Sequence, residues 1–274
     1  VVAGLLIVNA CGQEGGDKIK IQEKAKVEEK SQTQTPSPDP VLVAHNDKNE
    51  LDNKNNNDAE CTTVSGTIFY KGPEPKQQRV DMGADAICKG MHQDPVMSES
   101  ILTDKSGDNM TLRNVIVYVK KGLEGKKFET PKDAVVINQK GCMYNPHVFG
   151  MMVGQTLLIR NSDQTDHNIK STPTKNKSFN IGQVKGSPDK EQKFSMEEIV
   201  KLECNIHGWM NSYCGVFKHP YFSVTGEKGT FEIKDLPPGE YELEAWHEKL
   251  GKKTATVKIG DKEAKTQDFT FEGK

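Results

Sequence analysis

The sequence predicts an all-β protein that folds as a β-sandwich, on three observations. Short runs rich in Val, Ile, Thr, Phe and Tyr recur through the chain after about residue 62. The chain contains 24 Gly and 13 Pro, and many of them stand between these runs, where turns are expected. Apolar residues hardly ever recur with helical spacing, so we expect few helices.

The first strands are expected where β-forming residues follow the polar N-terminal part of the chain. One strand is predicted over 63–70, ended by Gly72 and Pro73. A second is predicted over 112–120, after an irregular stretch that contains Cys88. At 274 residues, the chain is long enough for one large domain or two modest ones.

The later strands share the same β-branched and aromatic composition and the same flanking turn residues. They are expected over 134–138, 155–160, 179–181, 198–204, 215–218, 229–234, 241–246 and 253–259. The segment 192–196 fits either a strand or a short helical turn.

The N-terminal part is expected to serve localisation rather than folding. An apolar run, 1–10, precedes Cys11 and resembles the end of a bacterial lipoprotein signal, so we expect 1–11 to be a signal remnant that ends at a lipidated Cys11. Residues 12–60 are polar and of low complexity, and we expect a disordered tether. The protein would then lie in the cell envelope, on the periplasmic or extracellular face, where disulfides persist.

Charge and motifs exclude several classes of function. The net charge is only -2, which argues against nucleic acid as a partner. The sequence has no His-Glu-x-x-His, Gly-x-Ser-x-Gly, phosphate loop or dinucleotide fingerprint. We therefore expect that the protein is not an enzyme. Asp163, Asp166 and the pair Glu197 and Glu198 are interpreted as polar loop or surface residues.

The chemically most informative segment joins three soft or borderline donors within seven residues. Cys204, His207 and Met210 offer a thiolate, an imidazole and a thioether. His167, in a polar segment after an earlier strand, supplies a second imidazole. One Cys, two His and a weak Met form the ligand set of electron-transfer copper sites. Cys204 could instead belong to a disulfide, and the same residues could bind zinc, although structural zinc usually takes more thiolates or a carboxylate.

Three motifs resemble the cupredoxin family of copper proteins. They are Gly141-Cys142-Met143-Tyr144-Asn145-Pro146-His147-Val148, Asn161-x-Asp163-x-x-x-His167-Asn168 and Cys204-x-Ile206-His207-x-Trp209-Met210. The resemblance implies a Greek-key β-sandwich of cupredoxin type over 61–220. The end of the chain, 229–241, resembles carboxypeptidase-regulatory, transthyretin-like modules. It implies additional C-terminal β-strands over 221–274 that pack on the sandwich.

The resemblance also assigns roles within the site. It implies that His167, Cys204 and His207 are strong ligands of one copper ion, and that Met210 is the weak axial ligand. The His207–Met210 spacing is shorter than in plastocyanins, a departure from the family pattern. Asn168 would join the two ligand loops by hydrogen bonding. Electrons would leave through a solvent-facing edge of His207.

Trp209 lies between two of the expected ligands. We expect it to pack over the site or to contact a partner. The remaining cysteines are expected to form disulfides, Cys88 with Cys142 and Cys61 with Cys214, although four cysteines allow three connectivities.

The predicted function is single-electron transfer by a lipid-anchored copper protein. Its partner would be a redox protein such as a cytochrome or a membrane oxidoreductase. A copper carrier or storage protein and a non-redox β-sandwich binding module are the alternatives.

Overall fold

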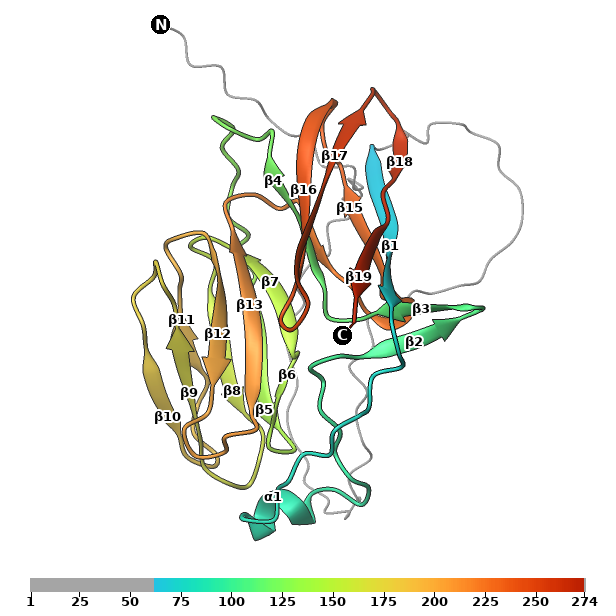
Figure 1. Ribbon diagram of the computed structural model, residues 1–274. Helices are drawn as coiled ribbons and strands as arrows, with labels where there is room; N and C mark the ends of the chain where they lie inside the picture. The colour runs from blue at the N-terminus through green and yellow to red at the C-terminus, as the bar shows by residue number, and fades with distance from the viewer. Residues whose placement is uncertain (1–61, 274) are drawn as a thin grey trace, which may run out of the picture. The chain divides into compact units, whose positions relative to one another are not determined.

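The computed structural model describes residues 62–273, which form two β-sandwiches with a short helical segment at one end (Figure 1). The prediction of an all-β sandwich is confirmed, since strands dominate and the only α-helix of this part of the chain has five residues. The expected signal remnant 1–11 with Cys11, the tether 12–60, and Cys61 lie outside the described residues.

The first sandwich, here the central sandwich, comprises residues 135–217. One sheet has the strand order β10-β9-β12-β13-β7, and the other has the order β11-β8-β5-β6. The bounds are β5 (Val135–Lys140), β6 (Met143–Asn145), β7 (Val148–Met152), β8 (Leu157–Asn161), β9 (His167–Thr172), β10 (Asn180–Gln183), β11 (Lys190–Gln192), β12 (Glu198–Glu203) and β13 (Asn211–Phe217).

The second sandwich, here the outer sandwich, takes strands from both ends of the described chain. One sheet has the order β15-β1-β3-β2, with β18 and β19 also paired to β1, and the other has the order β14-β4-β16-β17. The bounds are β1 (Thr63–Lys71), β2 (Thr103–Ser106), β3 (Asn109–Leu112), β4 (Ile116–Lys121), β14 (Phe222–Val224), β15 (Thr230–Lys234), β16 (Gly239–His247), β17 (Gly251–Ile259), β18 (Ala264–Thr266) and β19 (Phe269–Glu272). A 3-10 turn, η1 (Glu227–Gly229), precedes β15.

This pairing corrects the predicted domain boundaries of 61–220 and 221–274. Strand β1 pairs antiparallel with β15 and parallel with β18 and β19, all from the C-terminal part of the chain. Strand β4 pairs with β16 and β14. The segment 63–121 therefore belongs to the outer sandwich, because its backbone hydrogen bonds are made there rather than in the central sheets.

One expected strand is divided in two. The predicted strand 112–120 splits into the end of β3 and all of β4, because Asn114 between them has a φ of 59°. Asn tolerates this left-handed conformation better than most residues. The bend sends β3 and β4 into opposite sheets of the outer sandwich.

Each sandwich has its own core, as the alternating burial of its strands requires. In β12, Val200 and Leu202 are fully buried while their neighbours are only half-buried. A third cluster joins the two sandwiches through Ile116, Val148 and Phe217, which are all buried. The two cores are thus connected by an apolar seam, built from β4 on one side and β7 and β13 on the other.

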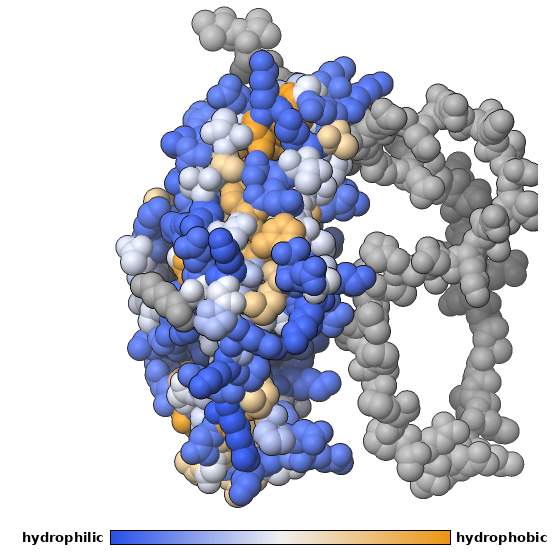
Figure 2. Space-filling view, turned by 45° about the vertical axis from the view of Figure 1, so that its right-hand side comes forward, coloured by the Kyte–Doolittle hydropathy of each residue, from blue (hydrophilic) through white to orange (hydrophobic). Residues whose placement is uncertain are grey.

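The surface that Figure 2 presents is mostly hydrophilic, with apolar atoms in small scattered areas. Within residues 62–273, no helix has the length and hydrophobicity needed to cross a bilayer.

Candidate metal centre

The hairpin of β12 and β13 carries three of the four expected ligands at one end of the central sandwich. Cys204 follows the last residue of β12 directly. Its backbone N–H donates to the Met210 carbonyl at 3.1 Å, and the Met210 N–H donates to the His207 carbonyl at 2.9 Å. These two bonds close the loop tightly, so that its side chains have fixed positions.

The fourth expected ligand comes from the neighbouring strand. Strand β9 pairs antiparallel with β12, with Lys170 opposite Glu203. This register places His167 beside Cys204. His167 is the first residue of β9 and 1% exposed, whereas the sequence interpretation placed it in a loop.

Three donor atoms converge on one point. The Nδ1 atoms of His167 and His207 are 3.0 Å apart, and the Cys204 Sγ is 4.0 Å from His207 Nδ1. The three residues are buried and form a group that could hold a metal ion, with donor atoms within 4.8 Å of one another. Two nitrogens bound at about 2 Å to one ion are separated by a similar distance, so the spacing fits a chelated metal.

The outer nitrogens of both imidazoles face carboxylates. His167 Nε2 lies 2.8 Å from Asp163 Oδ2, and His207 Nε2 lies 3.1 Å from Asp85 Oδ2. An ionised carboxylate can only accept a hydrogen bond, which assigns Nε2–H to each ring and leaves Nδ1 for the centre. Metal-bound histidines usually have such a partner on the second nitrogen.

Asn168 joins the two segments that carry the ligands, as the resemblance implied. Its Oδ1 accepts the Asn205 N–H at 2.7 Å and lies 3.3 Å from the Cys204 Sγ. Its Nδ2 donates to Asn180 Oδ1 at 2.7 Å. The thiol of Cys204 is therefore oriented by a side chain from the opposite strand.

The electrostatics of the site favour a thiolate. Burial alone would raise the pKa of Cys204, but hydrogen bonds from His167 and from backbone N–H groups lower it to about 6. Burial would likewise lower the pKa of His167, yet Asp163 and Cys204 raise it to about 9. A proton thus occupies the space among the donors, and metal binding would displace it.

The two carboxylates are themselves held in the ionised form. Burial opposes ionisation of Asp163, but hydrogen bonds from His167 and the N–H groups of Cys142 and Gly141 lower its pKa. The Cys88 N–H and then His207 lower the pKa of Asp85.

Trp209 and Met210 complete the surroundings of the loop. The Trp209 ring lies 5.0 Å from that of His207, and its Nε1–H donates to the Cys142 carbonyl at 2.9 Å. Trp209 therefore packs over the site. Met210 is fully buried in the core that also contains Cys204.

The expected solvent-facing edge of His207 is absent, and this prediction is wrong. The residue is only 2% exposed. The helix α1 (Ala86–Gly90), with Asp85 as its N-cap, covers the Nε2 side of the ring, where Cys88 Sγ also lies 3.5 Å away. The segment that covers the ring comes from the irregular stretch between β1 and β2, which sequence patterns could not place.

Of the two expected disulfides, the structure contains one. The disulfide between Cys88 and Cys142 is present, with the Cα atoms 5.6 Å apart. Cys214 is free and fully buried, so the predicted pair Cys61–Cys214 is wrong. The side chain of Cys214 belongs to the apolar core of the central sandwich, and burial raises the pKa of its thiol.

Sequence reasoning missed the two carboxylates. Asp163 was interpreted as a polar loop or surface residue. Its spacing of four residues from His167 could have indicated that it contacts this histidine. Asp85 had no comparable signal except its position three residues before Cys88. Two further metal-capable groups, Cys88–Cys142–His207 and Cys142–Asp163–His167, use sulfurs that are tied in the disulfide.

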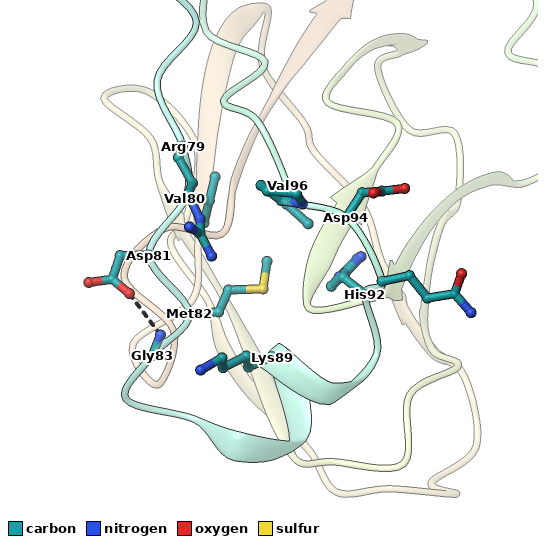
Figure 3. A pocket seen from close by; sticks show the side chains of 11 residues that line it. Arg79, Val80, Asp81, Met82, Gly83, Lys89, His92, Asp94 and Val96 are labelled. Carbon is teal, nitrogen blue, oxygen red and sulfur yellow. Dashed lines mark hydrogen bonds between the residues drawn. The ribbon is translucent and has the colours of Figure 1, made fainter.

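A cavity of about 250 Å³ lies beside α1 and is formed by 79–83, Lys89 and 92–96 (Figure 3). Met82 points into it, and Asp81 accepts the Gly83 N–H at 2.8 Å on its rim. None of the residues that line it is an expected ligand.

No protein-family model matches the sequence. No curated protein matches it either. Among solved structures, a purple cupredoxin from Nitrosopumilus maritimus is 27% identical, over 31% of this chain and 99% of that chain, with a TM-score of 0.27.

Two further structures are similar over a comparable part of the chain. Pseudoazurin from Methylobacterium extorquens AM1 is 18% identical, over 32% of this chain and 77% of that chain, with a TM-score of 0.28. Amicyanin from Paracoccus versutus is 19% identical, over 36% of this chain and 96% of that chain, with a TM-score of 0.28. At these TM-scores, the activities of those proteins do not transfer to this chain.

Proposed function

We propose that the protein binds one copper ion through His167, Cys204 and His207, with Met210 as a weak fourth ligand, and carries single electrons. The observation that carries the proposal is the convergence of one thiol and two imidazole Nδ1 atoms in a buried site. This donor set is that of electron-transfer copper centres.

The donor chemistry favours copper over zinc. A closed structural zinc site has four strong ligands, usually with two or more thiolates. Here the described donor group offers one thiolate and two imidazoles, and the fourth nearby residue of the loop is a methionine. A thioether is a soft ligand, which suits copper better than zinc.

The residues around the donors keep the site rigid. Asp163 fixes His167, and Asn168 fixes the Cys204 thiol and the backbone of Asn205. When bound, copper would supply a one-electron couple between Cu(II) and Cu(I). A site whose ligands are held in this way changes little between the two states, which favours rapid electron exchange.

The cellular setting remains part of the proposal. A lipid on Cys11 would hold the protein at the membrane in the cell envelope, and 12–60 would act as a tether. The partner would be a cytochrome or a membrane oxidoreductase. The near-neutral net charge of -2 supports a protein partner rather than nucleic acid.

Redox cycling and copper exchange test this function against copper transport. The protein is loaded with Cu(II), reduced with ascorbate and reoxidised with ferricyanide, while a Cu(I) chelator is present. We expect repeated cycling without loss of copper, because the three strong ligands are all less than 5% exposed. Rapid transfer of Cu(I) to the chelator would indicate a carrier, and failure to cycle would contradict electron transfer.

A further inference from the structure

The outer edge of His207 is bound rather than free. Its Nε2 lies 3.1 Å from Asp85 Oδ2, and the ring is buried. Asp85 is not part of either central sheet and reaches the site from the segment between β1 and β2. The proposed ligand His207 is therefore contacted by Asp85, and also by Cys88, from a segment outside the strands of the central sandwich.

The Asp85 carboxylate has two partners that fix its orientation. One oxygen accepts the Cys88 N–H at 2.8 Å, as the N-cap of α1, and the other faces His207. Because both oxygens are engaged, the carboxylate cannot rotate without losing a hydrogen bond.

The disulfide links this carboxylate to the one behind His167. Cys88, three residues after Asp85, is bonded to Cys142. The Cys142 N–H donates to Asp163 Oδ2 at 2.8 Å, and the same oxygen accepts from His167 Nε2. The two imidazoles are thus held from outside by two carboxylates that a single covalent cross-link connects.

We propose that Asp85 is a positioning residue for the metal centre, which holds His207 through Nε2–H and is itself held in place by the Cys88–Cys142 disulfide. This inference rests on the proposed function. A carboxylate on the outer nitrogen makes the imidazole more basic and fixes its orientation. A more basic ligand stabilises Cu(II) more than Cu(I), so Asp85 lowers the reduction potential.

The test compares two substitutions of Asp85 with a matched control. D85S keeps an N-cap side chain for α1 but cannot reach His207, and D85N keeps the cap but removes the charge. The control is D81N, because Asp81 lies in the same segment and accepts the Gly83 N–H without a contact to His207. A C88S/C142S double variant tests the role of the disulfide.

The first readout needs no metal. Nitrogen-15 NMR of the metal-free protein reports the tautomer of His207 and the exchange of its Nε2–H with water. We expect a slowly exchanging Nε2–H in the wild type and in D81N. We expect fast exchange in both Asp85 variants and an intermediate rate in the double variant. Unchanged exchange in D85S and D85N would overturn the assignment.

The second readout is the midpoint potential of the copper-loaded protein. Loss of such a carboxylate partner typically costs about 10-fold or more in metal affinity. A tenfold loss for Cu(II) alone raises the potential by about 59 mV. Equal potentials in D85S, D85N and D81N would contradict the proposal. If the wild type binds no copper, the proposed function fails, while the metal-free NMR experiment still decides whether Asp85 holds His207.

Discussion

Each of the three proposed strong ligands has a neighbouring polar side chain that holds it in place. Asp163 faces His167 Nε2, Asp85 faces His207 Nε2, and Asn168 faces the Cys204 Sγ. These contacts remove the freedom that an isolated imidazole or thiol would have. The metal-free site consequently already has the donor arrangement that an ion requires, and binding costs little reorganisation.

The contact of Asn168 can be tested by N168A, with N180A as its control. N168A leaves the Asn205 N–H without its acceptor, which we expect to cost about 1–3 kcal/mol in unfolding free energy. N180A removes only the part-buried bond from Asn168 Nδ2. Urea unfolding of the metal-free proteins measures both. Equal losses of unfolding free energy in the two variants would show that the hydrogen bond to the ligand loop adds no stability beyond that of the bond to Asn180.

A buried histidine in the outer sandwich makes stability depend on pH. Burial lowers the pKa of His247 to about 4. Its Nδ1 accepts the N–H groups of Lys249 and Leu250, so a second proton would break these bonds. The unfolded chain binds that proton below about pH 6.5, and the folded protein does so only near pH 4. Stability is therefore complete above pH 6.5 and falls as the pH drops towards 4.

This contribution amounts to about 3 kcal/mol between pH 7 and pH 4. H247N keeps an acceptor for the two backbone N–H groups but does not titrate in this range. We expect the fall in unfolding free energy to be smaller in H247N by about that amount, as measured by urea titration at several pH values. Parallel curves for the two proteins would refute the assignment to His247.

At the scale of elements, the hairpin of β12 and β13 and the neighbouring strand β9 build the inner side of the site. The short helix α1 and the disulfide build its outer side. The inner side depends on strand pairing, which places Cys204 and His167 next to each other. The outer side depends on one covalent bond, since α1 has only five residues and cannot be stable alone.

Removal of the disulfide tests how far α1 depends on it. The bond closes a loop with a sequence separation of 54, for which chain entropy predicts a loss of about 4 kcal/mol in C88S/C142S. C214A is the control, because it removes a buried thiol without a cross-link and should cost about 1 kcal/mol. Amide exchange should also become fast in 85–91 of the double variant alone. Retained protection there would contradict the dependence of α1 on the disulfide.

The inner side of the site could be predicted from the sequence, and the outer side could not. Cys204, His207 and Met210 lie close together in the sequence, and a strand before them fixes their loop. The prediction that His167 lies beside this loop needed only the assumption that two neighbouring strands end at the same edge of the sheet. Asp85 is more than 100 residues away from His207 in the sequence and belongs to no periodic pattern. Its approach depends on which cysteines pair, and composition does not decide that.

For the fold, too, the local elements could be predicted from the sequence and the long-range contacts could not. The individual strands 63–70, 134–138, 198–204 and 253–259 could be recognised, because each is rich in β-forming residues. The assignment of the first of them to the central sandwich was wrong. Pairing between strands that are about 170 residues apart in the chain depends on the complete fold and leaves no local signal.

At the scale of the whole molecule, the two sandwiches share a seam of buried aromatic and aliphatic side chains. Phe217 of β13 lies 4.6 Å from the Tyr118 ring of β4 and 4.9 Å from the Phe222 ring of β14. His147 of the central sandwich also contacts Glu248 of the outer one. We infer that the two sandwiches unfold together and that the outer sandwich stabilises the metal centre indirectly.

F217A tests this coupling, with V184A as its control. Truncation of a buried Phe lowers the free energy of unfolding by about 3–5 kcal/mol. Val184 is 59% exposed, so V184A should lower it by less than about 0.5 kcal/mol. Trp209 reports on the central sandwich and Trp246 on the outer one, so W246F and W209F backgrounds separate their fluorescence. We expect one shared transition in the wild type and two in F217A. Two separate transitions already in the wild type would argue against coupling.

The central claim is that Cys204 binds copper as a thiolate together with His167 and His207. The most direct measurement is titration of the metal-free protein with Cu(II), followed by visible absorption and electron paramagnetic resonance. The wild type should develop an intense thiolate-to-copper band at one equivalent of copper. C204S should lose the band, and C214A, which removes the other free buried thiol of residues 62–273, should keep it. A colourless wild type, or a band that survives in C204S, would contradict the claim.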